Sequence, residues 1–280
     1  GGSLVLRRGA ALEVVAGVAA ETGAETVYCS RAYEPWAATL EVALSDRLDA
    51  AGVTLRRFGG RLLREPEDLR TQAGEPYRVF TPFWRAIQSA GAPRRPLPAP
   101  RRLAGLERAV ASDRLDDWRL LPTKPDWAGG MRAAWRPGED QARERLARFV
   151  RTGLARYNET RDLRGVEGKS RLSPHLAMGE ISPATVWHAV ATHAAEAGGM
   201  SRGAETFLKE LAWREFSAHL LFHYPHLPEQ ALKPDLAAFP WASDERQLAA
   251  WQRGLTGYPI VDAGMRELWA TGHMHNRVRM

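Results

Sequence analysis

A proline- and arginine-rich stretch divides this chain into two parts with different hydrophobic patterns. Between Gly91 and Trp135 the sequence includes GAPRRPLPAPRRL and, further on, LLPTKPDWAGG. The repeated prolines exclude one continuous helix or strand, because each proline fixes its own φ and lacks a backbone N–H. A chain of 280 residues is long enough for two domains with separate cores. We therefore predict two domains joined by an irregular connector over residues 89–136.

The residues before the connector alternate between strand and helix patterns. Strand-like runs at 4–8, 26–29 and 53–60 are separated by two helical stretches, the first of which closes on Gly23. This alternation is typical of parallel strands joined by helical crossovers. Residues 1–88 are therefore predicted to form an α/β domain with part of a Rossmann-like parallel sheet. The abrupt start without methionine leads us to expect that the domain lacks its beginning.

The residues after the connector carry helical patterns only. Three long stretches have this character: EDQARERLARFVRTGLARYNETRD, SPATVWHAVATHAAEAGG and AETFLKELAWREFSAHLLFHYP. Ser182 and Pro183 supply a favoured N-cap and first helical residue for the second stretch, and the prolines of HYPHLP end the third. We predict an all-α domain over residues 137–280.

Composition limits the classes of function. Hydrophobic residues make up 44% and charged residues 26% of the chain, which is typical of a globular protein. No apolar run approaches the ~20 residues needed to span a bilayer, and no leader is present, so a cytoplasmic location is expected. The single Cys29 excludes a disulfide framework. The net charge of +6 is concentrated in residues 86–136, with ten basic against five acidic residues, and alone does not identify a nucleic-acid partner.

The segment GKSRLSPHLAMGEISP, residues 168–183, has the composition of a phosphate-binding turn. Gly168, Ser170 and Ser173 precede Pro174, a favoured first helical residue, so free backbone N–H groups are expected there. Lys169 adds positive charge. The alternative interpretation is an ordinary capped helix with solvated basic side chains, and the segment alone favours that alternative.

The helix-like segment FLKELAWREF places four chemically different side chains on one face. Phe207, Glu210, Trp213 and Arg214 are spaced by three and four residues or lie next to one another. Such a face suits a polar aromatic ligand that stacks on the indole and hydrogen-bonds the carboxylate. A buried tryptophan beside a surface ion pair is the alternative, which spacing alone favours.

Histidines and tryptophans offer weaker signals. His219 and His223 are spaced as i and i+4, but no cysteine or acidic residue completes a familiar ligand set, so no metal site is predicted. Trp241 and Trp251 lie ten residues apart. Most tryptophans pack in cores, so a redox function for them depends on a cofactor.

Taken together, several of these segments resemble the DNA photolyase and cryptochrome family. The segments EGKSRLSPHLAMGEISP, FLKELAWREF, WQRGLTGYPIVDAGMRELWATG and MHNRVRM occur in the order and spacing of that family, and VFTPFWRA resembles the end of its N-terminal domain. The resemblance covers nearly the whole chain and is strongest to bacterial class I cyclobutane pyrimidine dimer photolyases. It implies an antenna domain without its first strands, followed by a helical domain without its final third.

The resemblance implies a bound FAD in the helical domain, active in its reduced form. An antenna chromophore, folate or deazaflavin, is also implied, although this sequence does not identify it. The positions that match the cofactor-binding residues of the family are Tyr157, Lys169, Ser170, Arg171, Leu172, Ser173, Phe207 and Arg279.

The resemblance also implies an activity, namely light-driven repair of cyclobutane pyrimidine dimers in duplex DNA by a carbon–carbon lyase acting as a monomer. Glu210 would hydrogen-bond the flipped-out dimer, Trp213 would stack on it, and Asn276 and Met280 would line its pocket. Trp241 matches the surface end of the electron-transfer chain of the family. The residues expected near DNA phosphates are Arg161, Arg214 and Arg277.

Two departures and two alternatives stay open. Lys169 stands where the family usually has threonine, and His273 where tryptophan is common. Family members that repair (6-4) photoproducts have histidines at the positions of Asn276 and Met280, and plant-type cryptochromes commonly have aspartate at the first of them, so both positions favour cyclobutane dimers. The alternatives are a cryptochrome-type blue-light receptor without repair activity and an inactive fragment.

Overall fold

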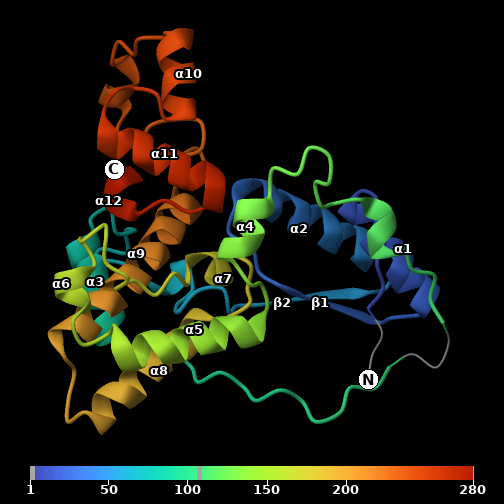
Figure 1. The fold of residues 1–280 in the computed structure, drawn as a ribbon. Coiled ribbons are helices and arrows are strands. Elements are labelled where there is room, and N and C mark those ends of the chain that lie inside the picture. The colour runs from blue at the N-terminus through green and yellow to red at the C-terminus, as the bar shows by residue number, and fades with distance from the viewer. Residues whose placement is uncertain (1–3, 106–108, 280) are drawn as a thin grey trace.

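The computed structural model describes residues 4–105 and 109–279 (Figure 1). Its first part contains α1 (Ala11–Thr22), β1 (Thr26–Ser30), α2 (Pro35–Asp49) and β2 (Thr54–Phe58). The two strands are parallel, with Thr26 paired to Thr54 and Ser30 to Phe58. The small parallel sheet and its crossover helix agree with the predicted α/β beginning of the chain.

The predicted strand at 4–8 was wrong, because this segment is not a strand in the structure. Its backbone is instead hydrogen-bonded to the connector. The Leu6 N–H donates to Ser112 Oγ at 2.9 Å, and the Leu6 carbonyl accepts from the Asp113 N–H at 2.7 Å. A strand needs a neighbouring strand to satisfy its backbone, and in the described residues the only sheet consists of β1 and β2.

The core of this first part is small. Ala19 of α1, Leu44 and Leu48 of α2, and Val53 before β2 are buried together. Gly23 ends α1 as predicted, in the left-handed conformation with φ of 66°. This smaller core is therefore formed by one consecutive helix–strand–helix–strand unit.

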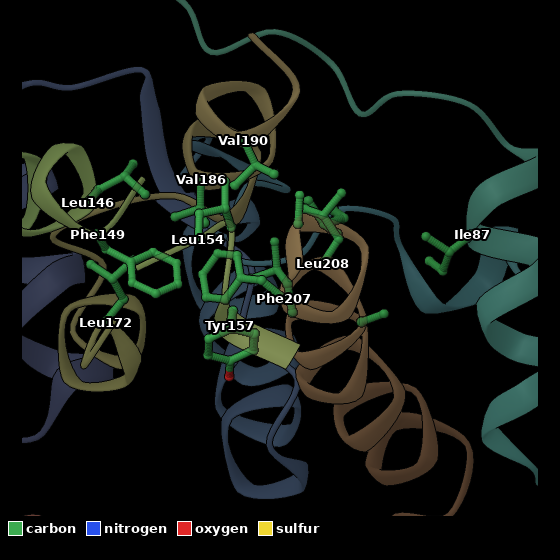
Figure 2. Close-up of a cluster of buried hydrophobic side chains, with 14 of the residues drawn as sticks. Ile87, Leu146, Phe149, Leu154, Tyr157, Leu172, Val186, Val190, Phe207 and Leu208 are labelled. Carbon is green, nitrogen blue, oxygen red and sulfur yellow. The ribbon is translucent and has the colours of Figure 1, made fainter. Parts of the chain in front are cut away.

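A much larger core lies around α9 (Arg202–His223), with α3 (Phe80–Ser89), α5 (Glu139–Thr152) and α8 (Pro183–Glu196) against it. Figure 2 shows its central side chains, among them Phe149, Phe207 and Val190. Five residues that precede position 88 are buried in this core: Leu63, Leu69, Phe83, Trp84 and Ile87. Residues 1–88, which were predicted to form one domain, therefore contribute side chains to two separate cores.

The helix boundaries follow local chemistry. The Ser182 side chain caps α8 by accepting from the Thr185 N–H at 3.1 Å, which confirms the predicted start of that helix. Ser201 caps α9 in the same way through the Ala204 N–H. α9 ends at His223, two residues before a proline, as the HYPHLP segment predicted.

The connector contains only short elements. Between α3 and α5 lie η2 (Leu115–Trp118) and α4 (Gly129–Ala134), whereas η1 (Pro66–Asp68) precedes α3. The chain passes beside α8, where the Pro93 carbonyl is 2.9 Å from His188 Nε2, and then crosses to the α1 side (Figure 1). No strand occurs among the described residues after position 137.

The remaining helices surround the site described below. They are α6 (Tyr157–Thr160), α7 (Ser173–Ala177), η3 (Pro234–Ala238), α10 (Glu245–Arg253), α11 (Pro259–Thr271) and α12 (Asn276–Arg279). α10, α11 and α12 are grouped at one end of the molecule, where α11 also contacts α4 (Figure 1). Within residues 4–105 and 109–279, no helix combines the length and hydropathy that crossing a bilayer would require.

Candidate cofactor and substrate site

A pocket of about 240 Å³ brings together most of the residues predicted for the site. Its wall is formed by the chain from α6 to the start of α7, by α9, and by the last residues of the chain. The predicted residues that line it are Tyr157, Arg161, Lys169, Ser170, Arg171, Leu172, Ser173, Glu210, Asn276, Arg277 and Arg279. Residues from three separate parts of the sequence thus converge on one cavity.

The other predicted residues lie elsewhere. Phe207 is buried in the core beside Tyr157. Trp213 and Arg214 follow on α9 outside this pocket. Trp241 is 79% exposed and contacts Phe239, with ring centroids 4.7 Å apart. Met280 lies outside the described residues.

The predicted phosphate turn leads directly into α7. α7 begins at Ser173, so Pro174 is its second residue rather than the first residue that the sequence predicted, and it still lies in the first turn. Arg171 adopts φ of 50°, a left-handed conformation that is uncommon for a residue with a side chain. Gly168 fits close to α6, because a Cβ there would lie 2.3 Å from Thr160 Oγ1. The turn is therefore held in a specific backbone shape.

Lys169 forms hydrogen bonds to the backbone of the loop that precedes this turn. Its Nζ donates to the Leu163 carbonyl and, at 2.8 Å, to the Val166 carbonyl. Burial and the nearby Arg171 guanidinium lower the pKa of Lys169. The residue that departs from the usual threonine of the family thus binds backbone carbonyls and adds positive charge beside the pocket.

Tyr157 lines the pocket and packs against the buried Phe207. Their rings pack edge to face with centroids 5.3 Å apart, and in Figure 2 the Tyr157 hydroxyl points away from the apolar cluster. Burial, followed by the Glu210 carboxylate, raises the pKa of Tyr157 to about 12. The phenol therefore remains protonated at neutral pH and can donate a hydrogen bond into the pocket.

An ion-pair network joins residues of the pocket lining. Glu210 on α9 pairs with Arg161, and Arg161 also lies 3.5 Å from Asp162. Asp162 accepts from Arg277 Nε at 2.8 Å, and this ion pair lowers the pKa of Asp162. Two of the arginines predicted to contact DNA phosphates are thus linked to the carboxylate predicted to contact the lesion.

Trp213 presents one indole face outward. It is 45% exposed, and its other face stacks on Phe80 with ring centroids 3.7 Å apart and planes inclined by 6°. Phe216 contacts both rings edge to face. Phe80 was missed by the sequence reasoning, although it lies in the VFTPFWRA segment. No local spacing reveals a contact between residues this far apart in the chain.

Arg214 forms an ion pair with the buried residue that follows it on α9. Its Nη1 lies 3.0 Å from the carboxylate of Glu215, which is 2% exposed and accepts from the Leu63 N–H at 2.6 Å. Burial raises the pKa of Glu215 to about 7, although Arg214 opposes that shift. The predicted contact of Arg214 with DNA stays a prediction, since this ion pair already engages the side chain.

The last residues form a third wall through hydrogen bonds to the residues that follow α6. His275 Nδ1 accepts from the Arg277 N–H at 3.0 Å, so its Nε2 carries the hydrogen that donates to the Arg161 carbonyl at 3.0 Å. Burial, followed by Arg171, lowers the pKa of His273, whose buried Nδ1 has no hydrogen-bond partner among the described residues. Both histidines border the predicted phosphate turn.

The TGYP segment orients α11, which supports this wall. Asp262 accepts from the backbone N–H and the hydroxyl of Thr256, at 2.8 and 2.6 Å, and from the Gly257 N–H at 3.0 Å. Further along α11, Gly264 allows α12 to approach, because a Cβ there would lie 2.3 Å from Val278 Cγ1. The segment therefore fixes the turn that precedes α11.

Comparisons with known proteins agree with this geometry. A family model described as DNA photolyase matches residues 1–101, and one described as the FAD binding domain of DNA photolyase matches residues 207–280. A deoxyribodipyrimidine photo-lyase of Agrobacterium fabrum is 47% identical over all of this chain and 58% of its own length. Cryptochrome-1 of Arabidopsis thaliana is 35% identical over 94% of this chain and 39% of its own length.

A solved structure shares the fold. The crystal structure of a bacterial class III photolyase from Agrobacterium tumefaciens superposes with a TM-score of 0.94 and 47% identity, covering 99% of this chain and 57% of that one. The chain belongs to the DNA photolyase and cryptochrome family. It spans about 58% of the length of that curated Agrobacterium relative. The motifs led us to expect the strongest likeness to class I enzymes, whereas the solved structure from Agrobacterium tumefaciens is described as a class III photolyase.

Proposed function

We propose that this chain carries out light-driven repair of cyclobutane pyrimidine dimers in DNA with a bound FAD. The observation that carries the proposal is the single pocket that joins the phosphate turn, Glu210 and Asn276, in a chain 47% identical to a deoxyribodipyrimidine photo-lyase. Damaged duplex DNA is the proposed partner, and we propose a cytoplasmic monomer as the working form.

The donor set of the pocket fits a flavin dinucleotide. Ser170, Arg171 and Ser173 would hold its diphosphate, Tyr157 would donate a hydrogen bond, and the unpartnered His273 Nδ1 offers a further polar contact. Arg279 would lie near the flavin ring. When bound and reduced, the flavin supplies the electron that blue light transfers to the dimer and that returns after the ring opens.

The residues above the cofactor would hold the lesion. Asn276 donates and accepts hydrogen bonds without transferring a proton, and the outward face of Trp213 offers a stacking surface. For Glu210 to accept from the dimer, it must exchange part of its ion pair with Arg161 for the ligand. That exchange frees the Arg161 guanidinium to contact a DNA phosphate, as we propose for Arg277.

The likeness to Cryptochrome-1 supports a second candidate, a light receptor without repair. The two candidates differ at Asn276. A repair site needs a neutral hydrogen-bonding partner for the lesion, whereas an acid at this position could supply a proton to the flavin. The amide of Asn276 therefore favours repair of cyclobutane dimers, a reaction that needs no proton donor.

The test uses defined duplexes that carry either a cyclobutane dimer or a (6-4) photoproduct. The 280-residue chain, and a chimera in which the flanking segments of the Agrobacterium relative extend it, are each loaded with reduced FAD and illuminated. We expect restoration of the cyclobutane dimer only, and only with light. Repair of the (6-4) lesion, or of neither lesion by the chimera, would overturn the proposal.

A further inference from the structure

The connector contains a basic segment that takes no part in the candidate site. From residue 76 to residue 106 the sequence has six arginines and no acidic residue. Two adjacent pairs, Arg94–Arg95 and Arg101–Arg102, are separated by the run PLPAP. Residues 94–102 are called the arginine–proline segment, and all of them are exposed. Much of the positive charge of the connector is therefore concentrated on a short surface segment.

The sequence of this segment restricts its backbone. Every residue from Arg95 to Pro100 is a proline or directly precedes one. A proline fixes its own φ, and the residue before it is confined to extended or polyproline II conformations. Residues 93–100 accordingly belong to no helix or strand in the structure. The run between the arginine pairs is therefore a semi-rigid extended spacer rather than a flexible linker.

The segment begins at a fixed point on the helical core. Pro93 is buried, and its carbonyl oxygen lies 2.9 Å from His188 Nε2 on α8. Just before it, Arg64 Nη2 donates to the carbonyls of Gly91 and Ala92, each at 3.1 Å. From there the chain runs along the outside of the molecule towards the α1 side (Figure 1). Neither the segment nor α8 lines the 240 Å³ pocket, so these arginines lie outside the candidate site.

The four arginines of the segment have no partner of their own. Within residues 4–105 and 109–279, no hydrogen bond or ion pair engages their guanidinium groups. By contrast, Arg161 and Arg277 at the pocket each pair with a carboxylate. Each unpaired guanidinium keeps its fork of N–H donors available for an external anion. Cations placed this close together also repel one another, and a bound polyanion would relieve that repulsion.

We propose that the arginine–proline segment binds the phosphate backbone of nucleic acid at a second site, separate from the pocket and independent of any lesion. A polyproline II backbone has three residues per turn and a rise of about 3.1 Å, so Arg95 and Arg101 share one edge at a separation of about 19 Å. Each strand of a duplex has a phosphate at every ~3.4 Å of the helix axis, so both arginine pairs can contact one duplex at the same time. Contacts of this kind carry no base specificity.

An anionic membrane is the other polyanion that four arginines would attract. Membrane-surface segments combine their basic residues with the apolar face of an amphipathic helix or with a lipid anchor. The prolines exclude a helix here, and Leu97 is the only large apolar side chain between the arginine pairs. Nucleic acid is therefore favoured, since charge and spacing alone are sufficient for it. The proposal does not rest on FAD, light or repair, so its test is separate from that of the proposed function.

The experiment measures the fluorescence anisotropy of a labelled, undamaged duplex of about 20 base pairs, titrated with the 280-residue chain over a series of salt concentrations. R94Q/R95Q and R101Q/R102Q each remove one arginine pair from the segment. At about 0.1 M salt we expect each double variant to weaken binding by about tenfold or more. Each should also reduce the slope of log K against log salt by about two, because two phosphate contacts are lost.

Two further variants separate the segment from general charge. R47Q/R253Q removes two exposed arginines, from α2 and α10, that have no ion-pair partner among the described residues. We expect this control to weaken binding by less than about twofold. P96S/P98S/P100S keeps every charge but loosens the spacer, which must then be ordered on binding. It should weaken binding by about threefold without changing the salt slope.

Duplex binding that is equally strong in the unmodified chain and in both arginine-pair variants would overturn the proposal. Equal weakening by R47Q/R253Q, with far-ultraviolet circular dichroism showing all variants folded, would also overturn it, because only net charge would then matter. Tighter binding to vesicles of phosphatidylserine and phosphatidylcholine than to the duplex, at the same salt concentration, would identify a membrane surface instead. An unchanged affinity of P96S/P98S/P100S would contradict the fixed spacing on which the proposal depends.

Discussion

The two cores of the molecule differ in the sequence distance between their members. The smaller core joins Ala19, Leu44, Leu48 and Val53, all from one consecutive α/β unit. The larger core joins residues 63–87 to α5, α8 and α9 across the whole connector. The candidate site lies on the larger core, since Tyr157 and Leu172 belong to both. Its geometry therefore depends on contacts between distant parts of the chain.

The interface between residues 63–77 and α9 shows how this long-range contact is made. Three side chains spaced by four residues on α9 meet backbone groups of the incoming segment. Glu215 accepts from the Leu63 N–H, His219 Nε2 accepts from the Tyr77 N–H at 3.1 Å, and His223 Nε2 lies 3.2 Å from the Pro66 carbonyl. Two of these groups have strongly shifted pKa values, so pH can weaken this interface without changing the smaller core.

The largest expected effect separates the two cores directly. Phe83 is fully buried in the larger core, and F83A should lower the free energy of unfolding by about 3–5 kcal/mol through lost burial and a cavity. Amide exchange should accelerate along α9 and in residues 63–77. L48A, at an equally buried position of the smaller core, should accelerate exchange in α1 and α2 instead. Matching exchange patterns in the two variants would contradict the division into two cores.

The next effect concerns Glu215. Burial raises its pKa in the folded state to about 7 from the ordinary 4.5, so the folded chain keeps a proton that the unfolded chain has lost between these values. The contribution of this group to stability therefore falls as pH rises through that window. Glutamine does not titrate, so E215Q should not lose this stability. The difference in free energy of unfolding between E215Q and the unmodified chain should therefore shift in favour of E215Q by up to about 3 kcal/mol from pH 5 to pH 8.

Urea unfolding of both proteins at the two pH values measures this difference. E205Q is the matched control, since Glu205 lies on the same helix in an exposed pair with Lys209. A Glu215 effect of the same size at pH 5 and pH 8 would show that its carboxyl does not titrate in this window.

The sequence predicted the parts of both regions that local chemistry decides. Ser182 and Pro183 start α8, Gly23 ends α1, and Pro225 follows the end of α9, because each boundary depends on neighbouring residues alone. The expected strand at 4–8 did not form, since a strand depends on a partner that local patterns do not specify. Its backbone partners are residues of the connector about a hundred positions away.

The candidate site shows the same limit. Spacing alone favoured the ordinary interpretation of both the phosphate turn and the α9 face, and only the family resemblance grouped them. The structure brings Ser170, Glu210 and Asn276 to one pocket. Phe80 was missed, because its stack on Trp213 arises from packing between α3 and α9, which has no local signature.

An opposite pH effect is expected from His219. Burial, followed by His223, lowers its pKa in the folded state to about 4 from the ordinary 6.5. The unfolded chain therefore binds a proton that the folded chain refuses, and stability falls as pH drops from 6.5 to 4. H219Q should remove this loss, as its amide oxygen can still accept from the Tyr77 N–H.

Unfolding measured at pH 7 and pH 5 tests the histidine, with H226Q at an exposed position as the control. The pH dependence of the unmodified chain alone does not isolate His219, because Glu215 and His219 change the free energy of unfolding in opposite directions over the same pH range. If the free energy of unfolding changed by the same amount between pH 7 and pH 5 in H219Q and in the unmodified chain, His219 would not titrate in this range.

The smallest effect concerns the stack between Phe80, the first residue of α3, and Trp213 on α9. Parallel rings with centroids 3.7 Å apart contribute about 1 kcal/mol beyond the area that they bury. F80L keeps apolar volume but removes the ring, and W213L removes the other partner. A double-mutant cycle of F80L, W213L and the combined variant should give a coupling free energy of about 1 kcal/mol in urea unfolding. The same cycle with F80L and F222L, whose ring makes no contact with Phe80 among the described residues, should give a coupling near zero. Equal couplings in both cycles would mean that Phe80 supports α9 generally, and the outward face of Trp213 would then not depend on this stack.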